Sequence, residues 1–330
     1  SGAYIPHRRL DRSEISALFG KGGGKGTRSV AGHDEDTTTM GAEAARNAVR
    51  DAGDTHIDSI WFATSTPAYL EKTNAAAIHA ALRLDPTVGA LDMGGALRSG
   101  IGTIRTALQG GGTTLVISAD VRDGMATSAD ESTGGDGAAA LVIGDDSAGP
   151  VIAEYLGAGI ATDEFLERWR VPGGERSRVW EERFGEVTYA PLMKAAFANA
   201  LDNAGITADD IDHLAVAGLH ARAIKRGGKA AFGAAAEKMV DDLSSTVGNT
   251  GTAHPALLLA ATLEEAEPGQ TIAVVMLADG VEVLILRTTD AIADYRAASP
   301  VAAQAAAGAP LAYGKFLSWR GMVAVEPPNR

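Results

Sequence analysis

The chain has 330 residues, a formal net charge of −13, 45% hydrophobic residues, 40 glycines and no cysteine. The negative charge argues against nucleic-acid binding, and the missing cysteines exclude disulfides, thiolate metal sites and cysteine nucleophiles. The length allows one large domain or two average ones, the glycines suit a compact α/β protein, and no apolar run reaches the roughly 18 residues of a membrane span.

The first half of the chain predicts alternating helices and strands. Small and apolar residues at helical spacing predict helices over 39–52, 73–84 and 95–109, and apolar runs predict strands over 59–64, 89–93, 113–119 and 138–144. Gly53 is a plausible residue to end the first helix, and the Gly110–Gly112 run ends the third. Leu115–Ile117 is wholly apolar, which is typical of a sheet covered on both faces.

The second half predicts the same alternation after a longer connection. Strands are expected over 151–156, 213–218, 271–277 and 281–287, and helices over 189–203, 221–243 and 248–265. An insertion over 157–186 holds Trp169, Trp180 and Phe184. The last forty residues depart from the scheme, with an Ala-rich stretch over 290–308 and an aromatic one over 313–321.

The two halves contain degenerate copies of the same segments. Asn47–Gly53 aligns without a gap against Asn199–Gly205, and Leu115–Asp120 pairs with Val274–Asp279. This duplication predicts an N-terminal half over 1–150, a C-terminal half over 151–290 and an extension over 291–330. It also predicts a site between the halves.

A histidine follows a predicted second-half strand, and four cations follow the histidine. The histidine is His220, and the cations are Arg222, Lys225, Arg226 and Lys229. Ligands of α/β folds bind at the carboxyl ends of strands, where the cations could hold the phosphates of a nucleotide-bearing ligand. The alternative is a structural histidine beside a surface helix with a solvated basic face.

Two Gly-rich turns open predicted helices. In Val247-Gly-Asn249-Thr-Gly251, the Asn249 amide could face a ligand carbonyl, although an Asn-Gly type turn with a helix cap is the better explanation of this motif taken alone. His254 is interpreted as a capping or packing residue. The other turn, Asp92–Gly100, offers backbone N–H groups at a helix N-terminus. Leu97 begins an apolar stripe and by itself is expected in the core.

Other motifs give negative results. The Gly20–Thr27 segment is rich in glycine, but it lacks the Gly-Lys-Ser/Thr ending of a phosphate-binding loop. The seven histidines do not have the spacing of metal ligands, so no metal site is predicted. Residues 1–26 contain no apolar segment typical of a signal peptide, and we expect a cytoplasmic protein without a membrane partner.

Together the motifs resemble the thiolase superfamily, closest to its hydroxymethylglutaryl-CoA synthase and ketoacyl synthase III branch. The resemblance covers residues 2–287 and includes Gly2–Pro6, Asp34–Thr37 and Gly135–Ala138. It implies an α/β fold built from two similar halves, with five layers (αβαβα) and two mixed sheets. It also implies that His220 and Asn249 stabilise a thioester enolate. The cations implied to bind coenzyme A are Arg222, Lys225, Arg226 and Lys229.

Two positions depart from the family pattern. Leu97 stands where the family has its acyl-accepting cysteine, and Ser65 stands where hydroxymethylglutaryl-CoA synthases have an acid/base glutamate. Ser99 and Thr66 are hydroxyl candidates nearby, but a hydroxyl nucleophile needs an adjacent base. The residues that could assist, with no ground for choosing among them, are Asp36, Ser65, Glu71 and Asp279.

The resemblance without its nucleophile favours chemistry on a substrate that is already a CoA thioester. An aldolase-type lyase that cleaves a β-hydroxyacyl-CoA is the leading hypothesis, and coenzyme A enters only as part of the substrate. The alternatives are a synthase-like acyltransferase or decarboxylase, and a non-catalytic scaffold subunit. The resemblance also implies a homodimer, and the aromatic tail over 313–321 suggests an OB-fold protein as partner or a fused OB-fold domain.

Overall fold

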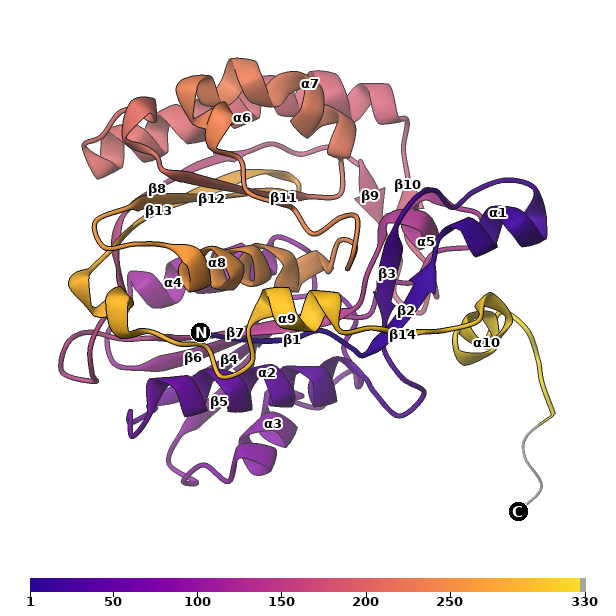
Figure 1. The fold of residues 1–330 in the computed structure, drawn as a ribbon, viewed down its shortest axis with the longest axis horizontal. Coiled ribbons are helices and arrows are strands. Elements are labelled where there is room, and N and C mark those ends of the chain that lie inside the picture. Colours follow the sequence, from indigo (N-terminus) through magenta and orange to yellow (C-terminus); the bar gives the residue numbers. More distant parts are fainter. Residues whose placement is uncertain (327–330) are drawn as a thin grey trace.

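A computed structural model describes residues 1–326 of the chain, with the side chain of residue 182 excepted. Figure 1 shows five stacked layers, in which two sheets alternate with three layers of helices. α6 and α7 cover the outer face of one sheet, α4 and α8 lie between the sheets, and α2 and α3 cover the other outer face. The expected αβαβα fold is therefore confirmed.

Each sheet is built from one half of the chain. The first has the order β1-β7-β6-β4-β5 and the second β11-β12-β13-β8. Both are mixed, because each contains parallel and antiparallel neighbours. The strands are β1 (Gly2–Tyr4), β4 (Ser59–Ala63), β5 (Gly89–Asp92), β6 (Thr114–Asp120), β7 (Gly137–Ile143), β8 (Ala153–Thr162), β11 (His213–Gly218), β12 (Thr271–Leu277) and β13 (Gly280–Thr288).

The duplicated segments occupy matching places. The antiparallel pair β6–β7 of the first sheet corresponds to the pair β12–β13 of the second. The copied helical segment ends α2 in the first half and α6 in the second. The helices of the layers are α2 (Thr37–Ala52), α3 (Ala75–Leu82), α4 (Ser99–Leu108), α6 (Glu182–Ala204), α7 (Ala221–Phe232) and α8 (His254–Glu265).

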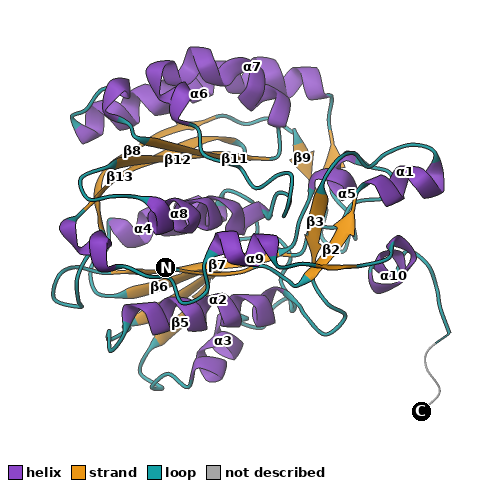
Figure 2. Cartoon of the chain, viewed as in Figure 1, coloured by secondary structure: helices purple, strands orange, loops and turns teal. Residues whose placement is uncertain are grey.

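A smaller unit lies beside the layers (Figure 2). Its three-stranded sheet has the order β14-β2-β3 and carries a separate apolar cluster that includes Leu10, Phe316 and Leu317. Its elements are β2 (Arg8–Asp11), α1 (Ser13–Phe19), β3 (Thr27–Val30), α5 (Ala129–Thr133), β14 (Ala309–Pro310) and α10 (Tyr313–Trp319). A hairpin of β9 (Arg168–Trp169) and β10 (Arg178–Val179) lies nearby, whereas α9 (Val301–Ala306) packs on α8 and β1 of the layers.

The core between the sheets explains the apolar runs. Val116 of β6, Val274 of β12 and Leu257 of α8 all belong to one buried cluster. Because α8 contacts both sheets, most of its residues are buried, and it shows little amphipathic pattern. None of the helices in the described residues is long and apolar enough to cross a membrane.

Several predicted boundaries were wrong, each for a local reason. α4 begins at Ser99 rather than residue 95, because Gly94 has a φ of +66° and leads into a turn. The predicted strand over 151–156 continues as β8 to Thr162. Gly157 and Gly159 within it leave room for α6, since a Cβ on Gly159 would meet the Ala196 carbonyl. α8 begins at residue 254, after a short 3-10 turn over 251–253.

The C-terminal extension is packed on the body as far as it is described. The Tyr313 N–H donates to Glu14 at 2.7 Å, and the Tyr313 hydroxyl donates to Glu131 at 2.8 Å. Arg320 pairs with Asp123 at 3.0 Å and also with Asp136. Residues 309–326 therefore help to form the smaller unit, whereas Ile292 and Val301 pack in the core between the sheets. The final residues 327–330 lie outside the described part.

A buried carboxylate connects this smaller unit to the first sheet. Asp136 accepts the N–H of Ala31 at 2.7 Å and the N–H of Arg122 at 2.8 Å. It also pairs with the Arg28 guanidinium at 3.3 Å, and neither side chain is exposed. A buried pair of this kind is sensitive to removal of one partner, because the other charge then stays buried without compensation.

We therefore expect Asp136→Asn to lower the free energy of unfolding by about 3–5 kcal/mol, measured by chemical denaturation. The amide keeps the shape of the side chain, but it cannot balance Arg28 and Arg320. Glu43→Gln is the control, because Glu43 pairs with Arg46 on the exposed face of α2, and its loss should cost less than about 1 kcal/mol. Equal effects of the two substitutions would contradict the account.

Candidate functional site

His220 stands at the carboxyl end of β11 and caps α7. Its Nδ1 accepts the N–H of Ala223 at 3.0 Å, and the residue is 7% exposed. Because Nδ1 acts as an acceptor, the neutral ring carries its proton on Nε2. The ring therefore has a fixed orientation and one N–H donor that is not used by this cap.

Asn249 is held by both halves of the molecule. Its backbone N–H donates to Thr133 and its carbonyl accepts from Gly135, both at 2.9 Å. Its side-chain Nδ2 donates to the Gly218 carbonyl at 2.9 Å, and its Oδ1 accepts the Gly251 N–H at 2.9 Å. Since Gly218 lies two residues before His220, the structure brings the predicted asparagine and histidine to the same strand end.

Leu97 lies in the turn that precedes α4. It is half-buried and packs against the core between the sheets. The turn is close to the Asn249 turn, since a Cβ on Gly100 would meet the Thr252 carbonyl. The hydrocarbon side chain of Leu97 has no group that could be acylated.

Ser65 is tied to the buried carboxylate of Asp120. Asp120 accepts the Ser65 N–H at 2.7 Å and the Ser65 hydroxyl at 2.9 Å. The same carboxylate accepts the Thr252 N–H at 2.8 Å. A turn of the first half is thereby fixed against the start of the central helix layer. Thr66 reaches the same carboxylate through its hydroxyl at 3.3 Å.

The other predicted helpers have different surroundings. Ser99 begins α4, and its carbonyl accepts the Thr103 hydroxyl at 2.6 Å. Asp36 caps α2 by accepting the Thr39 N–H at 2.8 Å, which is a structural role. Glu71 is exposed, and Asp279 lies in the turn between β12 and β13.

Glu167 is a site residue that the sequence reasoning missed. Its Oε1 lies 4.0 Å from His220 Nε2, and its Oε2 accepts the Tyr189 hydroxyl. Burial raises the pKa of Glu167, although the hydrogen bond from Tyr189 and the nearby His220 oppose this rise. Glu167 lies in the predicted insertion, and no motif or spacing distinguishes it there from the other carboxylates.

The four cations divide into two pairs. Arg222 and Arg226 form ion pairs with Glu186 at 3.3 Å and 2.8 Å. Lys225 and Lys229 are exposed on α7, which starts at His220. The lysines are thus the cations of this helix best placed to meet a phosphate from solvent.

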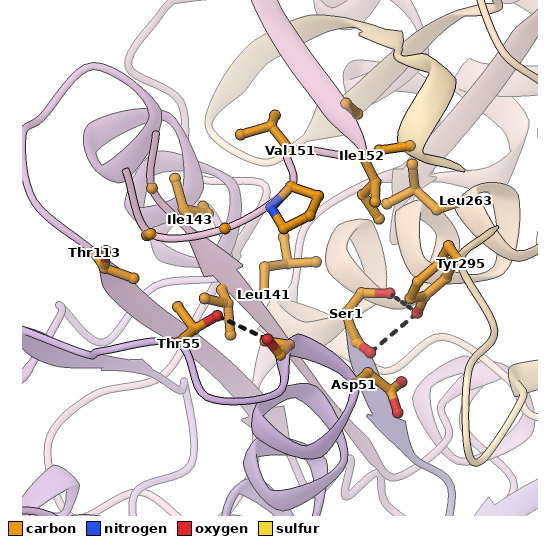
Figure 3. A pocket seen from close by; sticks show the side chains of 18 of the residues that line it. Ser1, Asp51, Thr55, Thr113, Leu141, Ile143, Val151, Ile152, Leu263 and Tyr295 are labelled. Carbon is orange, nitrogen blue, oxygen red and sulfur yellow. Dashed lines mark hydrogen bonds between the residues drawn. The ribbon is translucent and has the colours of Figure 1, made fainter. Parts of the chain in front are cut away.

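A cavity of about 380 Å³ lies at the opposite end of the sheets (Figure 3). Leu141, Ile143, Val151 and Ile152 contribute to its aliphatic wall. It also borders Thr113, which precedes β6, whereas the predicted site lies beyond the other end of that strand. Because of this separation, we do not assign the cavity to the His220 site. Among the described residues, no group of three or more His, Asp or Glu is arranged to hold a metal ion.

Similarity to known proteins is consistent with this geometry. Residues 201–286 match the family model described as 3-oxoacyl-[acyl-carrier-protein] synthase III C terminal. The hydroxymethylglutaryl-CoA synthase of Methanothermobacter thermautotrophicus is 30% identical, with 92% of this chain and 91% of that protein covered. The synthase of Aeropyrum pernix is 29% identical, with coverages of 98% and 94%.

Solved structures share the fold at lower identity. A hydroxymethylglutaryl-CoA synthase complexed with CoA superposes with a TM-score of 0.80 at 17% identity, covering 96% of this chain and 88% of that one. The 3-oxoacyl-(acyl carrier protein) synthase III of Pseudomonas aeruginosa gives a TM-score of 0.74 at 21% identity, with coverages of 87% and 96%.

His254 is buried at the start of α8, as a packing residue should be. Its Nδ1 lies 3.2 Å from the Thr250 hydroxyl, and burial lowers its pKa to about 4. The unfolded chain, with a histidine pKa of about 6.5, binds more protons between these two values. Protonation therefore favours unfolding as the pH falls through this window.

We expect the free energy of unfolding to fall by roughly 1.4 kcal/mol per pH unit from His254 as the pH drops from 6.5 towards 4. Chemical denaturation of the wild type and His254→Gln at several pH values measures this slope. The substitution should flatten it, and His56→Gln at an exposed site should not. An unchanged slope in His254→Gln would rule out the assignment.

Proposed function

Because this chain belongs to the hydroxymethylglutaryl-CoA synthase family of the thiolase superfamily, we propose that it acts on carbon–carbon bonds of acyl-CoA thioesters without forming an acyl-enzyme. The observation that carries this proposal is the hydrogen bond from the Asn249 amide to Gly218, two residues before His220 at the end of β11. The sequence resemblance assigns Leu97 to the position of the family's nucleophile. A substrate that arrives as a CoA thioester needs no acyl group on the protein.

Enolate stabilisation is supported by two side chains with N–H groups that are held in place by backbone hydrogen bonds. His220 presents Nε2–H, and Asn249 has a second Nδ2 hydrogen beyond the one that Gly218 accepts. Their orientation is fixed before a substrate binds, because each side chain is bonded to the backbone. Preorganised donors of this kind contribute about 10²–10³ each in rate when aimed at a developing oxyanion.

The reaction that uses this arrangement most fully is cleavage of a β-hydroxyacyl-CoA. A base takes the β-hydroxyl proton, the C–O bond becomes a carbonyl, and the Cα–Cβ electron pair moves onto the thioester. The resulting enolate oxygen accepts hydrogen bonds from His220 and Asn249, and Cα then takes up a proton. The same steps in reverse form the Cα–Cβ bond. The relatives are named as hydroxymethylglutaryl-CoA synthases, and hydroxymethylglutaryl-CoA is itself a β-hydroxyacyl-CoA, the class that we propose as substrate.

Synthase-like acyl transfer is the second candidate, because the relatives are hydroxymethylglutaryl-CoA synthases. In this chain it would need a serine in place of the lost nucleophile. Ser65 is the better supported hydroxyl, since its Oγ bonds to the Asp120 carboxylate at 2.9 Å. Ser65→Ala and Ser99→Ala, assayed for acyl transfer, separate the two hydroxyls.

Two interactions with other chains are also proposed. Homodimerisation is supported by β5, an edge strand of the first sheet with an exposed Leu91. An OB-fold partner would make a scaffold role possible, and tight co-purification of such a partner with a chain inactive on all thioesters would favour that role. Analytical ultracentrifugation of the purified chain tests the dimer.

We expect incubation with 3-hydroxy-3-methylglutaryl-CoA or a simpler β-hydroxyacyl-CoA to release a shorter acyl-CoA, detected by mass spectrometry. His220→Ala and Asn249→Ala should each lower the rate by at least about 100-fold. His213→Gln is the control, because His213 lies at the start of β11 and bonds to Gln270 at 2.9 Å.

The protein mass in the same reaction gives the deciding result. The intact protein should keep its unmodified mass throughout turnover, because Leu97 cannot accept an acyl group. A stable acyl adduct on the intact protein would overturn the non-covalent reaction and return the chain to the acyltransferase alternative.

The exposed lysines of α7 should bind the phosphates of the CoA moiety. Replacing Lys225 and Lys229 together with alanine should raise KM for the thioester several-fold and leave kcat close to the wild-type value, with a smaller effect at high salt. Replacement of the exposed Lys21 and Lys25 of the Gly-rich loop is the matched control. Equal KM values for the two double variants would contradict this role.

A further inference from the structure

The segment between β8 and the buried part of α6 closes over His220. Residues 166–187 lie between two buried aromatic side chains, Phe165 and Tyr189, whose ring centroids are 5.3 Å apart. Tyr189 packs on the His220 ring at 5.9 Å, and a Cβ on Gly185 would meet His220 Nε2. His220 is thus covered at the end of its ring where the proposed function needs a thioester oxygen.

This segment is held on the body by little apolar packing. Among the described side chains of residues 166–187, no large apolar one is buried, and the exposed ones are Leu166, Val171, Val179, Trp180, Phe184 and Val187. Pro191 in α6 has no N–H, so the Val187 carbonyl cannot receive the usual helical hydrogen bond from it. Segments with few buried apolar contacts open locally at a low cost in free energy.

Two arginines connect the segment to the first half of the chain. Arg168 binds both carboxylate oxygens of Asp130 in α5, at 2.6 Å and 2.5 Å. Arg170, which is exposed, donates to the Ser65 carbonyl. These contacts are polar, so water can replace the partners when the segment moves. We refer to the Arg168–Asp130 pair as the latch.

A carboxylate near the end of the segment connects it to α7. Glu186 forms ion pairs with Arg222 at 3.3 Å and with Arg226 at 2.8 Å. The sequence resemblance implies that both arginines bind coenzyme A, and guanidinium groups bind phosphates as well as carboxylates. A phosphate of the ligand and the Glu186 carboxylate therefore compete for the same groups.

We propose that residues 166–187 form a lid over His220 that the phosphates of coenzyme A open. The phosphates displace Glu186 from the two arginines of α7, and the first turn of α6 then moves away from His220. The inference rests on the proposed function, since it explains how a thioester reaches a histidine that is buried in this structure.

Both parts of the ligand favour the open lid. A ligand shifts a conformational equilibrium only if it binds one state better than the other. The phosphates bind the open state better because the arginines of α7 have then lost Glu186 as partner. The thioester also needs the open state, because Gly185 occupies the space beside His220 Nε2 in the closed one. Phe165 and Tyr189 belong to the buried cluster of the second half, so the two ends of the lid stay in place.

Amide hydrogen exchange of the full chain, followed by mass spectrometry, reports lid opening without any turnover. Saturating CoA should raise the exchange rate of residues 166–187 several-fold, because the bound ligand excludes the closed position. Pantetheine, which lacks the phosphates, should leave the rate unchanged, and high salt should weaken the effect of CoA. Slower exchange of these residues with CoA would overturn the proposal.

Asp130→Asn tests the latch, because it removes the charge that Arg168 binds. Without ligand, the exchange rate of the lid should rise by roughly 3-fold or more, and KM for the thioester should fall by the same factor, since the open fraction has grown. A merely structural defect would not lower KM. Glu43→Gln is the matched control, because Glu43 pairs with Arg46 on α2, away from the lid.

A reversible cross-link tests whether opening is required. The chain contains no cysteine, so Arg168→Cys with Asp130→Cys can be joined selectively by a short bis-methanethiosulfonate. The linked protein should lose at least about 10-fold in CoA affinity and thioester turnover, and dithiothreitol should restore both. Glu43→Cys with Arg46→Cys, linked in the same way, replaces an ion pair outside the lid and should keep both.

The outcomes separate the lid from the proposed function. A linked lid that leaves CoA affinity and turnover at their unlinked values would overturn the lid and leave the proposed function intact. A wild-type chain that turns over no thioester would refute the proposed function. The exchange of residues 166–187 then still decides the lid, because a rise with CoA supports it and an unchanged rate rejects it.

Discussion

The site depends on buried hydrogen bonds that lock one turn of the second half into the first. The backbone of Asn249 bonds to Thr133 and Gly135, while the N–H of Thr252 bonds to the buried Asp120 carboxylate. Buried backbone groups must find partners, and here the partners come from the other half of the chain. The position of the Asn249 amide beside Gly218, and so near His220, follows from this connection.

The two halves of the chain have similar folds, but they contribute different groups to the site. Asp120 and Asp279 are matching residues at the ends of β6 and β12, but Asp120 is buried and bonded, whereas Asp279 is exposed with a φ of +47°. The first half contributes the framework, through Asp120 and the turn of Leu97. The second half contributes the donors, and the long connection after β8 adds Glu167. One half therefore holds the site together while the other presents its polar groups.

Much of this could be predicted from the sequence because it depends on patterns within single segments. The apolar strands, the repeat and the order of His220 and Asn249 along the chain all followed from local periodicity or from recognisable motifs. The start of α4 was misplaced, since the left-handed backbone of Gly94 makes a turn where the pattern of residues predicts a helix. The strands β2 and β3 were missed: they pair with each other, and β2 also pairs with β14, far away in the sequence.

Glu167 could not be found in this way. A carboxylate in a polar insertion looks like a solvated charge, and the place of Glu167 beside the site depends on contacts with Tyr189 and His220, which lie 22 and more residues further on. Its raised pKa is a property of burial, and burial is decided by how the connection folds over α6. The lysines of α7 were found from the sequence, but the structure does not decide between their two interpretations. Their exposure agrees with both ligand binding and a solvated helix.

The most direct test of the central claim is a crystal structure with a stable, non-cleavable β-hydroxyacyl-CoA analogue bound. The account predicts the thioester oxygen within hydrogen-bond distance of His220 Nε2 and Asn249 Nδ2, and Leu97 in contact with the acyl chain without a bond to it. A thioester bound away from His220 and Asn249, or an acyl group attached to a serine, would contradict it.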